Sequence, residues 1–370
     1  NTAQTVTVTG VNDNNSDGHQ EYEVGLSAKR TEIDFEKENP EVTTFAGSSQ
    51  GSTDATGTSA SFKNPEGITT DGTNLYVVDR NNHLIRKIVI STGVVTTLAG
   101  SGSPGSTDAT GTSASFNIPK RITTDGTNLY VTEYTNNRIR KIVISTGVVT
   151  TLAGSSSGFA DGTGTSASFK EPIGITTDGT NLYVADRGNH RIRKIVISTG
   201  VVTTLAGSGT SGTTDATGTS ARFYNPMGIT TDGTNLYVLD TNNLRIRKIV
   251  ISTGVVTTLA GSTEGSTDGT GTSAKFKYPM GITTDGTNLY VLDSQNHRIR
   301  KIVISTGVVT TLAGSSDGFA DGTGTSARFA MPFGITIDGT NLYVSDNNNH
   351  RIRKIDLSKK ETTDLSLHNL

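Results

Sequence analysis

The ten-residue stretch STGVVTTLAG at residues 91–100 decides the fold, because the chain repeats it unchanged. Its further copies begin at Ser145, Ser198, Ser252 and Ser305. A second phrase, DGTNLYV, begins at Asp71 and returns five times at intervals of 53 or 54 residues. A repeat of more than about 40 residues with several strand-like runs is typical of β-propeller blades. The 370 residues therefore divide into six repeat units.

Each unit contains four short strand-like runs separated by tight turns. In the third unit the runs are residues 175–177, 182–185, 191–197 and 201–205. The Asp-Gly and Thr-Gly pairs between them are hairpin signals, because glycine accepts the positive φ that tight turns require. Val, Ile, Thr and Tyr dominate the runs, and no helical periodicity separates them. The sequence predicts an all-β fold, a six-bladed β-propeller of four-stranded antiparallel blades.

The two ends of the repeat region predict how the ring closes. Residues 41–47, EVTTFAG, copy the fourth strand of a blade but precede the first complete unit. The last unit has only its first three strands, which end near Leu357. We expect the N-terminal strand to complete the sixth blade and so to cover an open sheet edge. The propeller then spans 41–358, after an N-terminal extended segment or remnant of a β-sandwich module (1–40) and before a C-terminal tail (359–370).

The repeat unit resembles the NHL repeat. It carries Pro-x-Gly-Ile, Leu-Tyr-Val and Asp-x-x-Asn-x-x-Ile-Arg-Lys-Ile, and the first unit contains Asn82-His83-Leu84. The second unit departs from the pattern, with Arg121 in place of Gly and Glu133 in place of Asp. The resemblance implies a six-bladed propeller. Separately, residues 5–26 resemble the end of a Calx-beta or Ig-like module of bacterial surface proteins, which implies an extracellular or cell-surface location.

Composition removes several classes of function. The net charge is −2, and the basic residues repeat uniformly without the interleaved aromatics that stack on bases, so we expect no nucleic-acid partner. The sequence contains no cysteine, which excludes disulfides and thiolate metal sites. No apolar run reaches the roughly 18 residues of a membrane span, so we expect no membrane insertion. The arginine-rich third strands are interpreted as a solvated, salt-bridged blade surface.

The units differ mainly in the loop between the second and third strands and in the connections between blades. Variation on a rigid repeated frame is where binding function is usually placed. The residue after each proline should lie at the mouth of the central channel: Glu66, Lys120, Ile173, Met227, Met280 and Phe333. The predicted ligand site is Lys120, Arg121, Glu133, Tyr134, Arg187, Ile173, Met227, Met280 and Phe333. The alternative is that these side chains pack together and plug the channel.

No residue pattern indicates catalysis or a cofactor. The second strands end in Asp79, Glu133, Asp186, Asp240, Asp293 and Asp346, which should accept backbone N–H bonds and pair with arginines. One repeat position holds His83, His190, His297 and His350, which lie on different blades and should pack in loops rather than share a zinc ion. The aspartates of the blade connections, Asp54 among them, should form turns or helix caps. Calcium binding there is the alternative.

The sequence therefore favours a non-enzymatic extracellular binding or scaffold module of a larger bacterial surface or secreted protein. Its partner would be a protein, peptide or glycan on the variable face near the channel mouth. One alternative is a structural assembly module in which residues 1–40 donate a strand to a neighbour and so allow self-assembly. Another is a metal-dependent lyase or hydrolase at the channel mouth.

Overall fold

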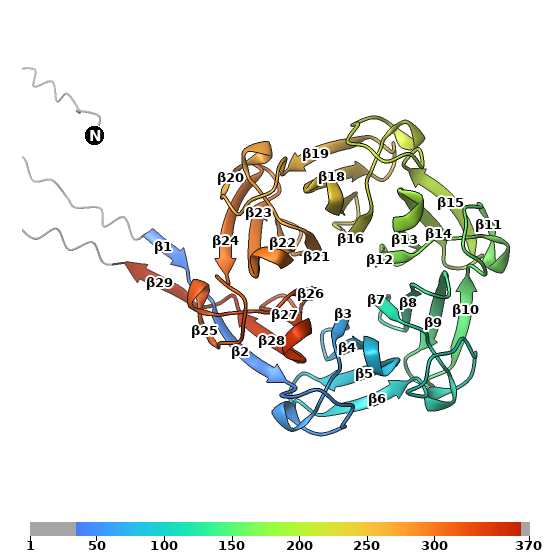
Figure 1. The fold of residues 1–370 in the computed structure, drawn as a ribbon, viewed down its shortest axis with the longest axis horizontal. Coiled ribbons are helices and arrows are strands. Elements are labelled where there is room, and N and C mark those ends of the chain that lie inside the picture. Colours follow the sequence, from blue (N-terminus) through green and yellow to red (C-terminus); the bar gives the residue numbers. More distant parts are fainter. Residues whose placement is uncertain (1–34, 364–370) are drawn as a thin grey trace, which may run out of the picture. The chain divides into compact units, whose positions relative to one another are not determined.

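The computed structural model describes residues 35–363, and in these the chain forms six blades that follow one another around a central channel (Figure 1). The innermost strand of each blade contacts the innermost strands of both neighbours. These strands are β3 (Pro65–Thr70), β7 (Pro119–Thr124), β12 (Pro172–Thr177), β16 (Pro226–Thr231), β21 (Pro279–Thr284) and β26 (Pro332–Ile337). The predicted six-bladed propeller is confirmed.

Three further strands extend each blade outward, each antiparallel to the one before it. The second strands are β4 (Asn74–Asp79), β8 (Asn128–Glu133), β13 (Asn181–Asp186), β17 (Asn235–Asp240), β22 (Asn288–Asp293) and β27 (Asn341–Asp346). The third strands are β5 (Leu84–Val89), β9 (Arg138–Val143), β14 (Arg191–Val196), β18 (Arg245–Val250), β23 (Arg298–Val303) and β28 (Arg351–Asp356). The fourth strands are β6 (Val95–Ala99), β10 (Val149–Ala153), β15 (Val201–Ala206), β19 (Val256–Ala260), β24 (Val308–Ala313) and β2 (Glu41–Ala46).

Short elements complete the blades. Two-residue strands add a fifth strand to three of the sheets: β11 (Gly162–Thr163), β20 (Gly269–Thr270) and β25 (Gly322–Thr323). One set of 3₁₀ turns precedes the inner strands: η1 (Gly57–Ser59), η3 (Gly111–Ser113), η4 (Gly164–Ser166), η6 (Gly218–Ser220), η8 (Gly271–Ser273) and η10 (Gly324–Ser326). A second set follows the second strands: η2 (Arg80–Asn82), η5 (Arg187–Asn189), η7 (Thr241–Asn243), η9 (Ser294–Asn296) and η11 (Asn347–Asn349). Strands β1 (Phe35–Glu38) and β29 (Lys360–Thr363) pair as a two-stranded sheet.

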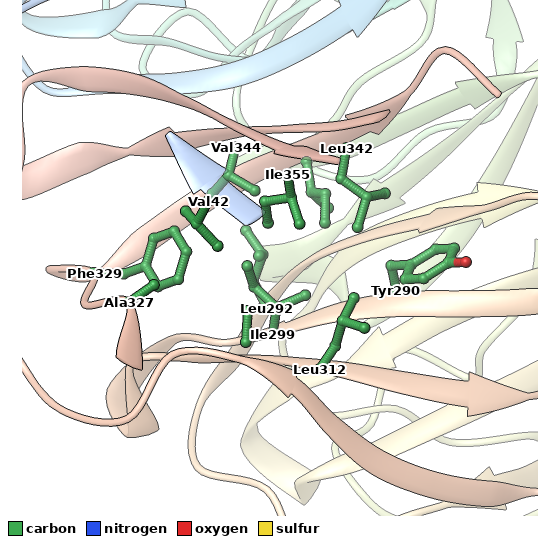
Figure 2. Packing of buried hydrophobic residues seen from close by; sticks show 12 residues of the cluster. Val42, Tyr290, Leu292, Ile299, Leu312, Ala327, Phe329, Leu342, Val344 and Ile355 are labelled. Carbon is green, nitrogen blue, oxygen red and sulfur yellow. The ribbon is translucent and has the colours of Figure 1, made fainter. Parts of the chain in front are cut away.

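The N-terminal strand closes the ring as predicted. Strand β2 pairs antiparallel with β28 of the last blade, with Val42 opposite Ile355. Both side chains are fully buried in a cluster with Phe329, Leu342 and Val344 (Figure 2). The sixth blade is thus built from both ends of the repeat region, so neither end can detach without exposing an apolar face and a sheet edge.

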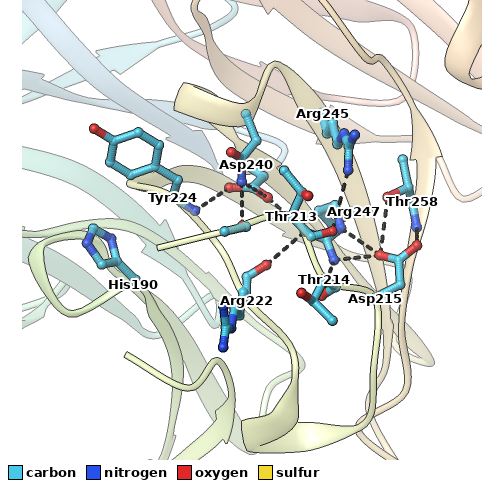
Figure 3. A network of polar contacts seen from close by, with 12 residues as sticks. His190, Thr213, Thr214, Asp215, Arg222, Tyr224, Asp240, Arg245, Arg247 and Thr258 are labelled. Atoms are coloured by element: carbon cyan, nitrogen blue, oxygen red, sulfur yellow. Dashed lines mark hydrogen bonds and ion pairs between the residues drawn. The ribbon is translucent and has the colours of Figure 1, made fainter. Parts of the chain in front are cut away.

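A buried arginine in every third strand is the main polar feature of the blades. In β18 the Arg247 guanidinium donates to Asp240 Oδ2 at 2.8 Å and to Asp215 Oδ1 at 2.5 Å (Figure 3). It also donates to the carbonyl oxygens of Arg222 and Thr214, both at 3.0 Å. The six equivalent arginines are fully buried: Arg86, Arg140, Arg193, Arg247, Arg300 and Arg353.

This network corrects two sequence-based interpretations. The third-strand arginines of the network are not a solvated surface, because their side chains lie inside the blades. The connection aspartates do not cap the 3₁₀ turns. The N-cap residues of η1 and η6 are Thr56 and Thr217, and neither makes a side-chain capping hydrogen bond. They bind the buried arginines instead, as Asp54 binds Arg86 at 2.6 Å. The prediction for the second-strand carboxylates is correct: Asp79 accepts from Arg86 at 2.9 Å.

We predict that Arg193→Ala lowers the free energy of unfolding by about 3–5 kcal/mol, because it leaves Asp186 buried without its cation. The matched control is Lys194→Ala on the same strand, whose side chain is half-buried and should change stability by less than about 0.5 kcal/mol. Urea denaturation of both variants measures the difference. Equal midpoints for the two variants would contradict a structural role for the buried arginine.

Candidate functional site

The residues that follow the prolines lie together at one end of the channel. The inner strands approach each other so closely there that the next position is glycine in five blades. A Cβ on Gly174 would lie 2.0 Å from the carbonyl oxygen of Met227, and one on Gly334 would lie 2.0 Å from that of Glu66. Glycine is required at these positions because any side chain would force neighbouring blades apart.

The second blade breaks this rule with a linked pair of residues. Arg121 occupies the glycine position, and Thr132 lies across from it on β8. The Thr132 hydroxyl accepts the Arg121 N–H at 3.0 Å and donates to the Ile173 carbonyl of the next blade at 2.7 Å. A single hydroxyl therefore joins the altered backbone to the neighbouring blade.

The Arg121 side chain crosses the ring. Its Nη2 donates to the Met280 carbonyl of the fifth blade at 2.7 Å, and its guanidinium carbon lies 4.3 Å from the centre of the Phe333 ring. Arg121 is 7% exposed. It borders a channel cavity of about 90 Å3, which is also lined by residues of all six inner strands. Arg121 does not line the second cavity, which lies at the mouth.

The second cavity, here called the mouth pocket, has a volume of about 240 Å3. Its lining residues are Arg80, Ile118, Lys120, Tyr134, Ile173, Arg187, Met227, Tyr278, Met280 and Phe333. Ile173, Met227 and Met280 form its buried apolar base, against which Tyr134, Tyr278, Met331 and Phe333 pack. The alternative of a plugged channel is therefore correct for the base, while a pocket remains above it.

The residue after each second-strand carboxylate makes the mouth asymmetric. In the fourth, fifth and sixth blades it is a small polar side chain bonded to the next blade: Thr241 and Ser294 donate to proline carbonyls at 2.9 and 2.7 Å, and Asn347 does so at 3.0 Å. In the first three blades it is Arg80, Tyr134 or Arg187, and all three line the pocket. In three blades this residue is thus hydrogen-bonded to the next blade, and in the other three its long side chain lines the pocket.

Ion pairs order the charged side of the pocket. Glu66 Oε1 lies 3.0 Å from Lys120 Nζ and 3.3 Å from Arg80 Nε. Arg187 pairs with Glu171 and lies 3.5 Å from the Tyr134 hydroxyl. Burial lowers the pKa of Lys120, against the opposing influence of Glu66. Burial likewise lowers the pKa of Arg121 to about 10.

The structure brings most of the predicted site residues together. Lys120, Tyr134, Arg187, Ile173, Met227, Met280 and Phe333 line the mouth pocket, and Arg121 lies beneath it. Glu133 does not line the pocket. It is fully buried and accepts a hydrogen bond from Arg140 at 2.9 Å, as the equivalent aspartates of the other blades do from their arginines. Sequence reasoning missed Arg80, Ile118 and Tyr278 as lining residues. The signal for Arg80 was available, because it shares the repeat position of Tyr134 and Arg187.

The residue before each of the six inner-strand prolines has left-handed backbone geometry. The φ angles are 53° at Asn64, 49° at Ile118, 53° at Glu171, 51° at Tyr278 and 47° at Met331. Asparagine tolerates this region, whereas a β-branched residue such as isoleucine is rarely found there. Three of these costly residues, at 118, 278 and 331, line the mouth pocket or pack on its base.

We predict that Ile118→Asn raises the free energy of unfolding by about 1 kcal/mol, because asparagine tolerates the left-handed region, whereas the strain of a β-branched residue there costs on the order of 1–3 kcal/mol. The reverse exchange at the equivalent position of the fourth blade, Asn225→Ile at φ 50°, should lower it by a similar amount. Thermal and urea unfolding measure both. A loss of stability in Ile118→Asn would show that side-chain packing at the mouth outweighs the backbone strain.

Histidines of one blade hold these strained residues of the next. His83 Nδ1 accepts the Ile118 N–H at 3.4 Å, His190 accepts that of Asn225 at 3.2 Å, and His350 accepts that of Asn64 at 3.1 Å. The prediction that the histidines pack in loops is confirmed for these three. Burial, helped by neighbouring cations, lowers the pKa of all three imidazoles below the usual 6.5.

We predict that acid destabilises the propeller through these histidines. Their pKa is lower in the folded than in the unfolded chain, so the stability that they contribute is complete well above pH 6.5 and is lost as the pH falls below it. In the second blade Asn137 Oδ1 performs the same task, accepting the Glu171 N–H at 2.9 Å. Between pH 7.5 and 5.5 the melting temperature of the triple variant His83→Asn, His190→Asn, His350→Asn should therefore decrease less than that of the wild type. Parallel Tm curves would contradict this role.

Within residues 35–363 no group of three or more His, Cys, Asp or Glu side chains is placed to hold a metal ion. Within the same range no helix is long and apolar enough to cross a membrane.

Comparison with known proteins agrees with the repeat and the fold. The family model of the NHL repeat matches residues 169–195, which contain β12 and β13. NHL repeat-containing protein 2 from Homo sapiens is 29% identical over 328 residues, which cover 77% of this chain and 45% of the human protein. The chain thus spans less than half the length of that relative. The resemblance of the repeat unit to the NHL repeat is confirmed.

Solved structures with the same fold include binding proteins and enzymes. An auxiliary nutrient binding protein from Bacteroides thetaiotaomicron VPI-5482 has a TM-score of 0.66 at 19% identity, over 88% of this chain and 77% of that one. A streptogramin B lyase has a TM-score of 0.53 at 16% identity, over 86% of this chain and 98% of that one. At such identities the likeness concerns the fold alone.

Proposed function

We propose that this chain is a non-enzymatic binding module of a larger secreted or surface-exposed bacterial protein. Its ligand is a protein, peptide or glycan that inserts a group into the mouth pocket. The observation that carries the proposal is the asymmetry of this pocket: three blades line it with long side chains, Arg80, Tyr134 and Arg187, in a ring whose strands and turns are nearly identical.

The asymmetry combines the features of a binding site. Ligand pockets are concave, mostly apolar and furnished with a few polar groups that fix orientation. Here Met227, Met280 and Phe333 supply apolar surface, and Lys120 and Arg187 supply charge. Strained backbone at Ile118 and Tyr278 supports the same interpretation, because such strain accumulates at functional sites. The description of one structural neighbour as a nutrient binding protein is consistent with it.

Two alternatives have less support. The assembly hypothesis depends on residues 1–40, most of which lie outside the described residues. The described part of this segment contains β1, which pairs with β29 of the same chain. The hypothesis of a metal-dependent lyase or hydrolase has no ligand set among residues 35–363.

The test is a screen of peptides, proteins and glycans against the wild type and the double variant Lys120→Ala, Tyr134→Ala. Ligands of the wild type should bind the variant at least tenfold more weakly, because truncating a central contact residue costs about 2 kcal/mol or more. The control variant is Tyr224→Ala, Lys194→Ala, which removes the same two residue types outside the pocket lining. Equal binding by the wild type and the Lys120→Ala, Tyr134→Ala variant would refute the site assignment.

A further inference from the structure

The charged side of the mouth has fewer carboxylates than cations. Glu66 is the acidic partner of both Arg80 and Lys120. Arg187 and Glu171 form a separate one-to-one pair. Arg121 makes no ion pair within residues 35–363, and its only side-chain hydrogen bond there is to the neutral carbonyl of Met280. The three cations that line the mouth pocket, Arg80, Lys120 and Arg187, therefore have two carboxylate partners. Arg121, beneath the pocket, adds a second unmatched positive charge.

The excess charge is buried. Lys120 is 8% exposed, Arg121 is 7% exposed and Glu66 is 1% exposed. Removing an ion from water costs several kcal/mol, which must be offset by a partner of opposite charge. The Nη1 of Arg121 is buried without a hydrogen-bond partner among the described residues, and so is the Oε2 of Glu66. Aromatic rings offset part of this cost, since Lys120 Nζ lies 5.4 Å from the Phe333 ring and 5.5 Å from the Tyr134 ring.

The volume and the uncharged lining of the pocket indicate which chemical group of a ligand could carry the negative charge into it. Its volume of about 240 Å3 is below the roughly 300–1,000 Å3 of pockets that enclose whole drug-sized ligands. Besides the cations, the lining includes the side chains of Met227, Tyr278 and Met280. The space thus suits one terminal group with an anionic end and an apolar body.

We propose that the mouth pocket binds an anionic end group attached to an apolar body. Lys120 and Arg80 attract the negative charge, while the methionines and Phe333 cover the apolar part. The inference rests on the proposed binding function and specifies its ligand. It identifies Lys120 as the residue that determines specificity for charge.

Matched probes separate charge from shape. N-acetylphenylalanine and its amide have the same apolar body, but only the first carries a carboxylate. A second pair, phenyl glucuronide and phenyl glucoside, has an aromatic body in both members and distinguishes an acidic sugar from a peptide terminus as the source of the anion. The three methionines of the chain, Met227, Met280 and Met331, all belong to the mouth cluster, so 13C-methyl labelling of methionine reports on this site alone.

We expect N-acetylphenylalanine to shift the methionine methyl signals with at least tenfold higher affinity than its amide, because hydrogen bonds to charged groups contribute roughly 1.5–3 kcal/mol. Its affinity should fall as NaCl rises, and that of the amide should not. If phenyl glucuronide shows the larger preference over its neutral partner, the anion comes from a sugar and the proposal still holds.

Two substitutions should act in opposite directions. Lys120→Leu removes one cation and should reduce the preference for the acid severalfold. Glu66→Gln raises the excess to three positive charges and should increase the affinity for the acid severalfold. Damage to the fold would weaken binding in both variants, and their melting temperatures check for it.

The outcomes distinguish this inference from the proposed function. If acid and amide bind equally, the pocket is a binding site but its selectivity for anions is refuted. If neither probe pair moves the methyl signals, the inference is refuted, and the screen with the Lys120→Ala, Tyr134→Ala variant still decides whether a larger ligand uses the pocket.

Discussion

The buried arginine of each third strand is the interaction on which the rest of the structure depends. In the third blade, Arg193 joins Asp186 on the second strand to Asp161 in the connection from the previous blade. Asp186 also accepts the Lys170 N–H at 2.8 Å, two residues before the inner strand begins. Asp161 binds Thr204 of the fourth strand. One guanidinium therefore links the outer strands to the segment that leads into the inner strand. The residues at the channel mouth follow directly on that segment and are positioned by it.

The strands and their closure followed from the repeat, whereas the placement of the arginines did not. Repeated turns and β-branched runs define the strands locally, and the copy of a fourth strand at residues 41–47 showed how the ring closes. The RIRK run, by contrast, has the composition of an exposed strand. The burial of Arg140 depends on Glu133 and Asp108, which are 7 and 32 residues away. Pairing at such separations leaves no local pattern.

The candidate site was predictable to the extent that it coincided with variation between units. Ile173, Met227 and Met280 could be predicted because the position after the inner-strand proline varies between blades. Only Met227 and Met280 are the same residue type there. Glu133 also stood out but lies in the buried network, since a longer side chain there still reaches Arg140. Arg80 was overlooked because loop variation alone does not reveal that half of the ring binds the next blade and the other half lines a pocket. That division depends on contacts between blades.

The second blade argues against neutral drift as the origin of this asymmetry. A side chain at its glycine position should disrupt the contact with the third blade, yet Thr132 restores the contact through two hydrogen bonds of its hydroxyl. In the sixth blade the equivalent residue is Ser345, beside a glycine, and its Oγ has no partner among the described residues. A hydroxyl at this position is therefore useful only together with Arg121. Two linked departures that preserve the ring and place a cation across its axis are what a functional requirement at the mouth would produce.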